Sequence, residues 1–403
     1  MSNKVLQVCL VSNGALPIPD VKGGAIERLI TMLIEDNEQY QNVEFTVITC
    51  KNHKAELLQS KFKHTKFINI RTYGTLYNKL AWKLRGLMRR LTNKEFYQFN
   101  AFERKAERYL LQYGIKFNYI ISEGSDPHMM RNVAKKYGSQ KLILHLHCHM
   151  IANPQYDKIY GNIWGVSSFV VKQYEKNSTL PKEAFQVLFN GIDLNRFKKE
   201  ISPEERLQLR HKLGFTKNDF IIIFCGRIIK GKGVKELIQA ILNIEESTIK
   251  LLIVGSSNFK QSNSGVYVND ITNLINSAED RIKFTGFIDN ADVYKYYKIA
   301  DIGINPSLFE DACPLVLFEM LACGLPTIAT LSGGMPEIGN PQTTIYIHKD
   351  ERMITELEQS IMQLYLNHTK RLIMSKASIQ QSEKYTRQKF YEDFCQLISK
   401  TNM

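Results

Sequence analysis

The sequence predicts two doubly wound α/β domains, in each of which helices cover both faces of a parallel sheet. An apolar run at residues 5–11 is followed by a loop containing Gly23-Gly24 and by a helical pattern over residues 25–37. This order of strand, glycine turn and helix opens a doubly wound domain. The same order returns with an apolar run at residues 220–225, a glycine-rich loop and a helical pattern at residues 234–242.

Length and composition agree with two domains. The chain has 403 residues, of which 44% are hydrophobic, and a domain takes roughly 150 residues. The composition turns polar at residues 198–205, where the second strand and helix series begins. We therefore place the first domain at residues 1–197 and the second at residues 198–380. We expect the polar helical segment 381–403 to complete the first domain.

The net charge and the cysteines indicate which partners and which cellular compartment to expect. The net charge of +13 favours anionic partners, namely nucleotides, nucleic acid or an acidic membrane surface, without choosing among them. The seven cysteines form no C-x-x-C pair, which is typical of a protein of the reducing cytoplasm. No apolar run is long enough to span a membrane, and the start lacks a signal-peptide pattern. We expect a cytoplasmic protein, and peripheral attachment to the inner face of the cell membrane stays open.

Residues 76–91 form an amphipathic helical pattern with a basic face. Five leucines between residues 76 and 91 recur at spacings of four and three, which gives one apolar stripe. The basic and interfacial positions are Lys79, Trp82, Lys83, Arg85, Arg89 and Arg90. Such a helix suits an anionic bilayer surface, and an ordinary domain helix with a solvated basic face is an equal alternative. A nucleic-acid surface would interleave more aromatic residues, so we expect no nucleic-acid partner.

Three histidines lie at the end of an apolar run at residues 142–146 or just after it. His145 and His147 alternate along a strand and share a face, with Cys148 and His149 next in the chain. They could converge on a metal ion, but no acidic residue lies close by in the sequence. A histidine at a strand end can instead form a hydrogen bond with a substrate. We favour this second role and predict no metal site.

Basic residues follow the strand predicted at residues 220–225. Gly226-Arg227 comes first, and Lys232 lies just before the predicted helix. A guanidinium and an ammonium beside a helix start suit a diphosphate. A solvated basic loop is the weaker alternative, because ligands of such folds bind at the carboxyl ends of the strands. The P-loop pattern G-x-x-x-x-G-K-[ST] is absent.

An acidic residue lies in the middle of an apolar helical pattern. We predict a helix at residues 315–323, just after Pro314, and a strand at residues 327–330. Glu319 lies among leucine, valine, phenylalanine and methionine, and a lone acid there is costly without a partner. It is either part of a buried ion pair or faces a polar ligand.

Together these motifs resemble the retaining GT-B glycosyltransferases of family 4, and the resemblance covers nearly the whole length. The motifs that carry it are Gly23-Gly24, Ser167-Ser168-Phe169, Phe189-Asn190-Gly191-Ile192-Asp193, Gly226-Arg227, Lys232-Gly233, Asn305-Pro306-Ser307, Glu319, Cys323-Gly324-Leu325-Pro326 and Gly333-Gly334-Met335-Pro336-Glu337-Ile338.

The resemblance implies a role for each motif in binding a nucleotide sugar. Arg227 and Lys232 would neutralise the donor diphosphate, and Glu319 would hold the ribose hydroxyls. Backbone amides of Gly24, Leu315 and Val316 would lie at the phosphates, Gly23 and Gly226 would belong to the loops that bind the donor, and His147 would lie near the transferred sugar. In the family, seven residues usually separate the first acid from the second. Counted back from Glu319, the first position is Asp311 here, with Glu310 one residue further out, so either acid could reach the sugar and donor choice stays open.

The resemblance therefore implies transfer of a sugar, expected from a UDP-sugar, to a glycan or lipid-linked acceptor in bacterial cell-surface polysaccharide synthesis. It implies neither a metal nor a cofactor, because Arg227 and Lys232 supply the cations. A nucleotide-sugar epimerase and a non-catalytic surface or coat protein of the same fold are the alternatives.

Overall fold

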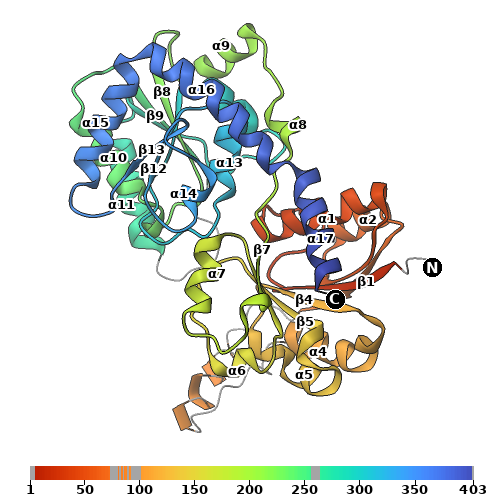
Figure 1. The fold of residues 1–403 in the computed structure, drawn as a ribbon. Helices are drawn as coiled ribbons and strands as arrows, with labels where there is room; N and C mark the ends of the chain where they lie inside the picture. The colour runs from red at the N-terminus through yellow and green to blue at the C-terminus, as the bar shows by residue number, and fades with distance from the viewer. Residues whose placement is uncertain are drawn as a thin grey trace. The chain divides into compact units, whose positions relative to one another are not determined.

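The computed structural model describes residues 5–72, 80, 83–84, 86–88, 90–91, 101–255 and 264–401. The chain divides into two compact units, residues 1–191 with 387–403 and residues 192–386. Each unit contains one parallel sheet with helices on both faces, as Figure 1 shows. Among the described residues, no helix has both the length and the apolar character that crossing a membrane requires.

The first unit contains a seven-stranded sheet in the order β3-β2-β1-β4-β5-β6-β7. Its strands are β1 Leu6–Ser12, β2 Val43–Cys50, β3 Thr65–Ile70, β4 Tyr119–Glu123, β5 Leu142–Leu146, β6 Asn162–Gly165 and β7 Phe185–Val187. Its main helices are α1 Ala25–Tyr40, α2 His53–Gln59, α4 Ala101–Tyr113, α5 Arg131–Tyr137, α6 Pro154–Asp157, α7 Ser168–Glu175 and α17 Arg387–Lys400. The order reverses between β1 and β4, which is where ligands of such sheets bind.

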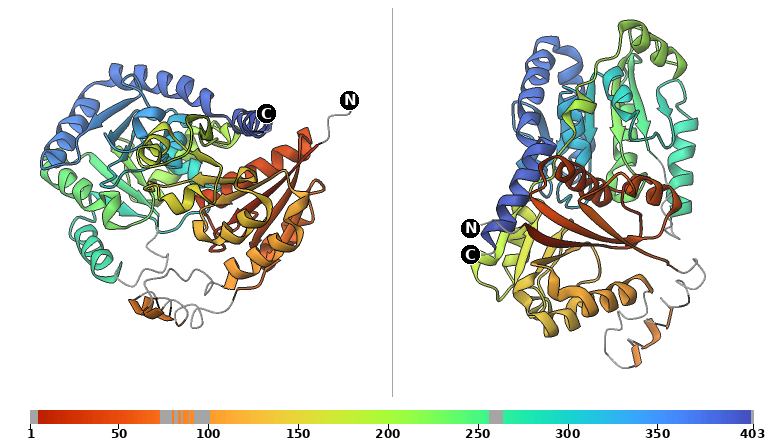
Figure 2. Two further views of the ribbon diagram at one scale, coloured as in Figure 1. Left: turned by 60° about the horizontal axis from the view of Figure 1, so that its bottom comes forward. Right: turned by 90° about the vertical axis from the view of Figure 1, so that its right-hand side faces the viewer.

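The final helix α17 belongs to the first unit although it follows the second in sequence. Its Tyr391 ring stacks on Tyr40 of α1 with the centroids 5.4 Å apart. The Arg387 guanidinium lies 2.6 Å from the Asp36 carboxylate. Figures 1 and 2 show α17, in blue, beside α1, in red.

The second unit contains a six-stranded sheet in the order β10-β9-β8-β11-β12-β13. Its strands are β8 Phe220–Cys225, β9 Ile249–Val254, β10 Ile282–Phe284, β11 Ile302–Asn305, β12 Thr327–Thr330 and β13 Thr344–Ile347. Its main helices are α8 Leu194–Phe197, α9 Pro203–Lys212, α10 Val234–Asn243, α11 Ser264–Asn276, α12 Val293–Ile299, α13 Leu315–Ala322, α14 Met335–Ile338, α15 Met353–Leu366 and α16 His368–Ser382.

The central strands β1, β8 and β11 are mostly apolar and buried because helices cover both faces of each sheet. In β8, Ile222 and Phe224 are almost fully buried and pack in one core with Ile238 of α10 and Ile253 of β9. The predicted doubly wound α/β architecture is confirmed. The polar side chains of the candidate site lie at or just beyond the carboxyl ends of the strands.

Candidate functional site

Two loops of the second unit meet beside the carboxyl ends of the neighbouring strands β8 and β11. The turn Lys230–Lys232 leads from β8 into α10, and Gly233 has φ of +67°. A Cβ atom at Gly233 would lie 1.9 Å from the carbonyl oxygen of Pro306 in the loop after β11. Glycine at this position therefore permits both the left-handed backbone and the close approach.

This approach brings Lys232 to the carboxylate of Asp311. The two side chains form an ion pair, and the Ser307 hydroxyl donates to the same carboxylate oxygen over 3.2 Å. The Lys232 ammonium also lies 4.8 Å from the centroid of the Phe309 ring. Lys232 is thus held in place, and an arriving phosphate would compete with Asp311 for it.

Arg227, predicted to act beside Lys232, lies exposed in the same loop. Its side chain forms no hydrogen bond or ion pair within the part of the chain that the structure describes. The preceding amide of Gly226 donates to Val254 of β9 over 2.9 Å and so continues the sheet. The guanidinium is therefore available to an anion.

The other acid of the pair, Glu310, points to a different cation. It forms an ion pair with Lys349, which follows β13, and accepts from the Gly333 amide over 2.6 Å and the Ser332 hydroxyl over 3.2 Å. Burial raises its pKa, but Lys349 and these donors outweigh burial and hold the pKa of Glu310 below its usual value. Glu310 is therefore a carboxylate at neutral pH.

Glu319 lies in α13, only 5% exposed. The Tyr297 hydroxyl of α12 donates to its Oε2 over 2.8 Å, and Tyr297 is itself fully buried. The helix begins at Leu315, where Pro314 supplies no side-chain cap. The first amides of a helix have no partner within it, so those of Leu315 and Val316 suit an anion.

In the first unit, an internal carboxylate occupies the glycine loop. Asp20 Oδ1 accepts from the amides of Gly23 over 2.7 Å, Gly24 over 3.2 Å and Lys22 over 3.3 Å. Arg28 of α1 lies 3.8 Å from the other carboxylate oxygen. The loop therefore does bind an anionic group, and a phosphate at Gly23-Gly24 would have to replace Asp20.

A second acid, Glu27 of α1, lies under this loop. Its side chain is 3% exposed, and a Cβ atom added at Gly24 would lie 1.9 Å from its Oε2. Its Oε1 is buried and finds no hydrogen-bond partner among the described residues. Burial is the main cause that raises the pKa of Glu27 to about 7, and the charge of Asp20 adds to it.

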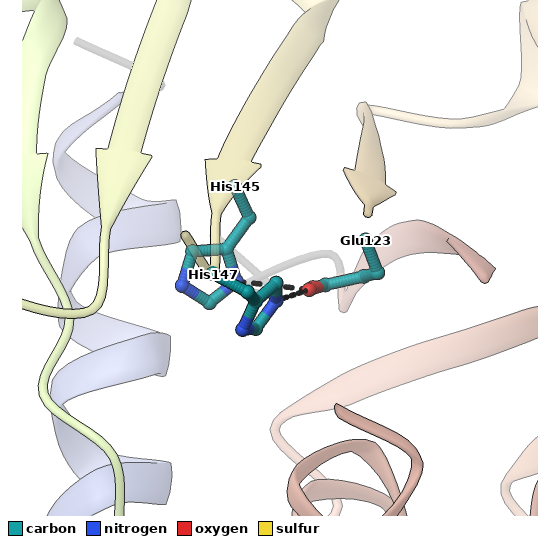
Figure 3. A group of neighbouring side chains, drawn as sticks. All are labelled: Glu123, His145 and His147. Atoms are coloured by element: carbon teal, nitrogen blue, oxygen red, sulfur yellow. Dashed lines mark hydrogen bonds and ion pairs between the residues drawn. The ribbon is translucent and has the colours of Figure 1, made fainter. Parts of the chain in front are cut away.

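His145, near the end of β5, and His147, just after it, converge on a carboxylate from the neighbouring strand β4. Glu123 Oε2 accepts from His145 Nδ1 over 2.9 Å and from His147 Nε2 over 2.5 Å, as Figure 3 shows. Burial raises the pKa of Glu123, but the two imidazoles outweigh it and hold the pKa well below its usual range. Burial also lowers the pKa of His147, helped by the charge of His145 and against the pull of Glu123.

These three residues could also hold a metal ion. One ligand atom from each lies within 4.8 Å of the others, and two histidines with one carboxylate form a known zinc ligand set. The acidic partner could not be predicted from the sequence because Glu123 lies 22 residues before His145. Adjacent parallel strands place both at one edge of the sheet.

Other partners were also missing from the prediction. Asp20, Glu27, Tyr297 and Lys349 each contact a predicted residue or loop, yet none belongs to a motif. Of the predicted basic helix, residues 80, 83–84, 86–88 and 90–91 are helical, with Lys83 and Arg90 exposed. Lys79, Trp82, Arg85 and Arg89 lie outside the described residues.

The fold of this protein is also found in solved structures. The chain matches the Anabaena HepE structure with bound UDP-glucose with a TM-score of 0.74 and 17% identity, over 98% of this chain and all of that one. This likeness, together with the two parallel sheets, gives the GT-B fold and confirms that prediction.

Sequence comparison then gives the family of the second unit. Residues 205–381 match the model described as Glycosyl transferases group 1, in agreement with the motifs of that unit. A Methanocaldococcus jannaschii protein described as an uncharacterized glycosyltransferase is 31% identical over 39% of each chain. The GDP-mannose-dependent monoacylated alpha-(1-6)-phosphatidylinositol monomannoside mannosyltransferase of Corynebacterium glutamicum is 27% identical over 62% of this chain and 67% of its own. The chain thus spans from about four tenths to about two thirds of these relatives' length.

Proposed function

We propose that this protein is a retaining glycosyltransferase that moves a sugar from a UDP-sugar to an acceptor hydroxyl. The observation that carries the proposal is the pairing of Lys232 with Asp311 next to the exposed Arg227. Two cations at the carboxyl edge of a parallel sheet suit a diphosphate whose negative charge grows as the sugar leaves. Preorganised charge of this kind is the main catalytic device for such a reaction.

Each remaining group of the second unit has a part in this proposal. The amides of Leu315 and Val316 at the start of α13 donate to the phosphates, and Glu319 accepts from the ribose hydroxyls. Asp311 lies beside Lys232, whereas Glu310 is held by Lys349. We therefore assign the sugar hydroxyls to Asp311, and Glu310 to the support of the loop at Gly333.

The reaction as proposed does not need a metal ion, because Arg227 and Lys232 supply the positive charge. The incoming hydroxyl attacks on the face of the leaving group, and a phosphate oxygen takes its proton. Activity in the presence of a chelator tests this part, since a metal-dependent transferase would lose its turnover.

The proposed acceptor is a glycan or a lipid-linked sugar at the inner face of the bacterial cell membrane, used in cell-surface polysaccharide synthesis. Leu80, Leu84, Leu87 and Leu91 of the basic helix are 44% to 71% exposed rather than packed in a core. Exposed leucines beside basic residues suit an anionic bilayer. The Corynebacterium relative is also named for a lipid-bearing acceptor.

A screen of UDP- and GDP-sugars tests the proposal at the level of the donor. Binding to the native state raises the melting temperature, so a UDP-sugar should protect the protein more than the matching GDP-sugar. Product analysis with and without an acceptor then separates transfer from epimerisation. A non-catalytic coat protein would show no protection by any nucleotide sugar and no product.

A further inference from the structure

The hydrogen bonds among Glu123, His145 and His147 determine which ring nitrogen of His147 carries a proton. Both imidazoles donate to a single oxygen, Oε2 of Glu123. A carboxylate can only accept, so the nitrogen of His147 that faces it, Nε2, carries a proton. A neutral imidazole has one N–H only, and the other nitrogen is then an acceptor.

His147 differs from His145 in its access to solvent. The side chain of His147 keeps 10% of its surface exposed, against 4% for His145. The second nitrogen of His145, Nε2, is enclosed and has no hydrogen-bond partner among the described residues. In Figure 3 the second nitrogen of His147 lies on the side of its ring away from Glu123. His147 is therefore the member of the group that can meet a ligand.

We propose that Glu123 is a positioning residue that fixes His147 in the Nε2–H tautomer. Nδ1 of His147 then accepts a hydrogen bond from a hydroxyl of the sugar substrate and cannot donate one. His145 donates to the same oxygen from the buried side and keeps the carboxylate in place. This inference rests on the proposed function for the identity of its ligand, whereas the tautomer itself can be measured without any substrate.

A carboxylate that orients the ligand-binding nitrogen of a histidine is a recurring device. In metal sites, removing such an orienting partner costs about 10-fold to 100-fold in affinity or activity. The same geometry could serve a metal ion here, because the three ligand atoms lie within 4.8 Å of one another. Bound metal is thus the rival outcome of the test.

The test compares two substitutions at Glu123 on the full chain labelled with nitrogen-15 in histidine. Glu123→Gln keeps an oxygen that can accept from both rings, whereas Glu123→Met has a similar volume and no such acceptor. Glu107→Met is the matched control, because Glu107 is another buried glutamate of this unit and accepts from Asn132. Two-bond proton–nitrogen spectra at neutral pH report which nitrogen of His147 is protonated.

We expect the wild type, Glu123→Gln and the Glu107→Met control to share one spectrum for His147, with Nε2 protonated and Nδ1 bare. Glu123→Met should lose this signature and lower kcat about 10-fold to 100-fold, while the KM of the donor changes less than threefold. Glu123→Gln should retain most of the turnover.

Three results would overturn the inference. The first is a protonated Nδ1 in the wild type, a measurement that does not require any variant to fold. The second is an unchanged His147 spectrum in folded Glu123→Met. The third is a stoichiometric metal ion in the purified protein that changes the His147 signals when a chelator removes it. If the tautomer is as expected but no nucleotide sugar is used, the proposed function fails and the positioning role of Glu123 stands.

Discussion

Lys232 and Asp311 form an ion pair in the second unit, and the neighbouring Glu310 pairs instead with Lys349. Two consecutive acids thus pair with two different cations. The pairing keeps Lys232 fixed before any anion arrives, and a diphosphate would take over the ammonium and release the Asp311 carboxylate. Released in this way, Asp311 could accept from hydroxyls of the sugar.

The position of Asp311 predicts that its length affects donor choice. Asp311→Glu moves the carboxylate outward by one methylene and should change the ratio of kcat/KM between two UDP-sugars by about 10-fold, the range that one methylene commands. Glu310→Asp is the matched control and should leave this ratio within about twofold, because its pocket is formed by Lys349 and Ser332. Equal effects of the two substitutions would show that Asp311 and Glu310 do not have the different roles proposed for them.

Tyr297 should be needed for nucleotide binding through Glu319. Tyr297→Phe removes the hydroxyl that holds one oxygen of a buried carboxylate, which should lower the free energy of unfolding by about 1–3 kcal/mol. It should also raise the Kd of UDP about 10-fold in titration calorimetry, because the carboxylate loses its fixed orientation. Tyr365→Phe removes a hydroxyl that pairs with Thr248 and should leave this Kd unchanged. Full affinity in Tyr297→Phe would argue against the role of Glu319.

Glu27 should make stability depend on pH. Its pKa of about 7 in the folded state lies above the ordinary value of 4.5, so the folded protein keeps a proton that the unfolded chain loses between these values. Stability should therefore fall as pH rises from 4.5 to 7 and stay lower above that. Glu27→Gln removes this loss. Its free energy of unfolding should rise relative to that of the wild type by on the order of 3 kcal/mol as the pH goes from 5 to 8.

The measurement for Glu27 is a pair of denaturant titrations at those two pH values. Glu107→Gln, at another buried glutamate of the first unit, sets the background. A gain that is the same at both pH values would show that Glu27 is already ionised in the folded protein at pH 5.

The basic helix predicts binding to anionic lipid. Changing Lys83, Arg85, Arg89 and Arg90 to Glu should abolish flotation with vesicles rich in phosphatidylglycerol, because attraction and apolar insertion act together. The control changes Lys54, Lys61, Lys63 and Lys66, which are exposed elsewhere in the first unit, and lowers the net charge equally. If both variants float like the wild type, or if both fail, the helix is not a specific docking surface.

The sequence predicted what depends on local pattern. The strand β12 was predicted with the bounds Thr327–Thr330, and α13 begins at Leu315 as expected after Pro314. Contacts between strands were out of reach, because Glu123 and His145 are neighbours only once β4 and β5 pair. The hydrogen bonds from the Gly23 and Gly24 amides to Asp20 could not be predicted for another reason. An aspartate in a loop is common, and only the conformation of the backbone shows which amides donate to it.

For a similar reason, the sequence could not predict that Glu310 and Asp311 pair with different lysines. Their spacing from Glu319 left both acids within reach of the sugar. The choice depends on Lys349, which follows β13 and forms its ion pair with Glu310 from 39 residues further along the chain. Counting residues inside one motif cannot include such a partner.

The turnover of Lys232→Ala in sugar transfer from its best UDP-sugar donor tests directly whether Lys232 neutralises the leaving diphosphate. Removing one preorganised charge donor of a transition state costs about 10²-fold to 10³-fold in kcat, and we expect a loss of that size with a melting temperature close to that of the wild type. Lys349→Ala, which breaks the neighbouring ion pair with Glu310, should keep turnover within about threefold. Near-normal transfer by folded Lys232→Ala would show that Lys232 does not stabilise the leaving diphosphate.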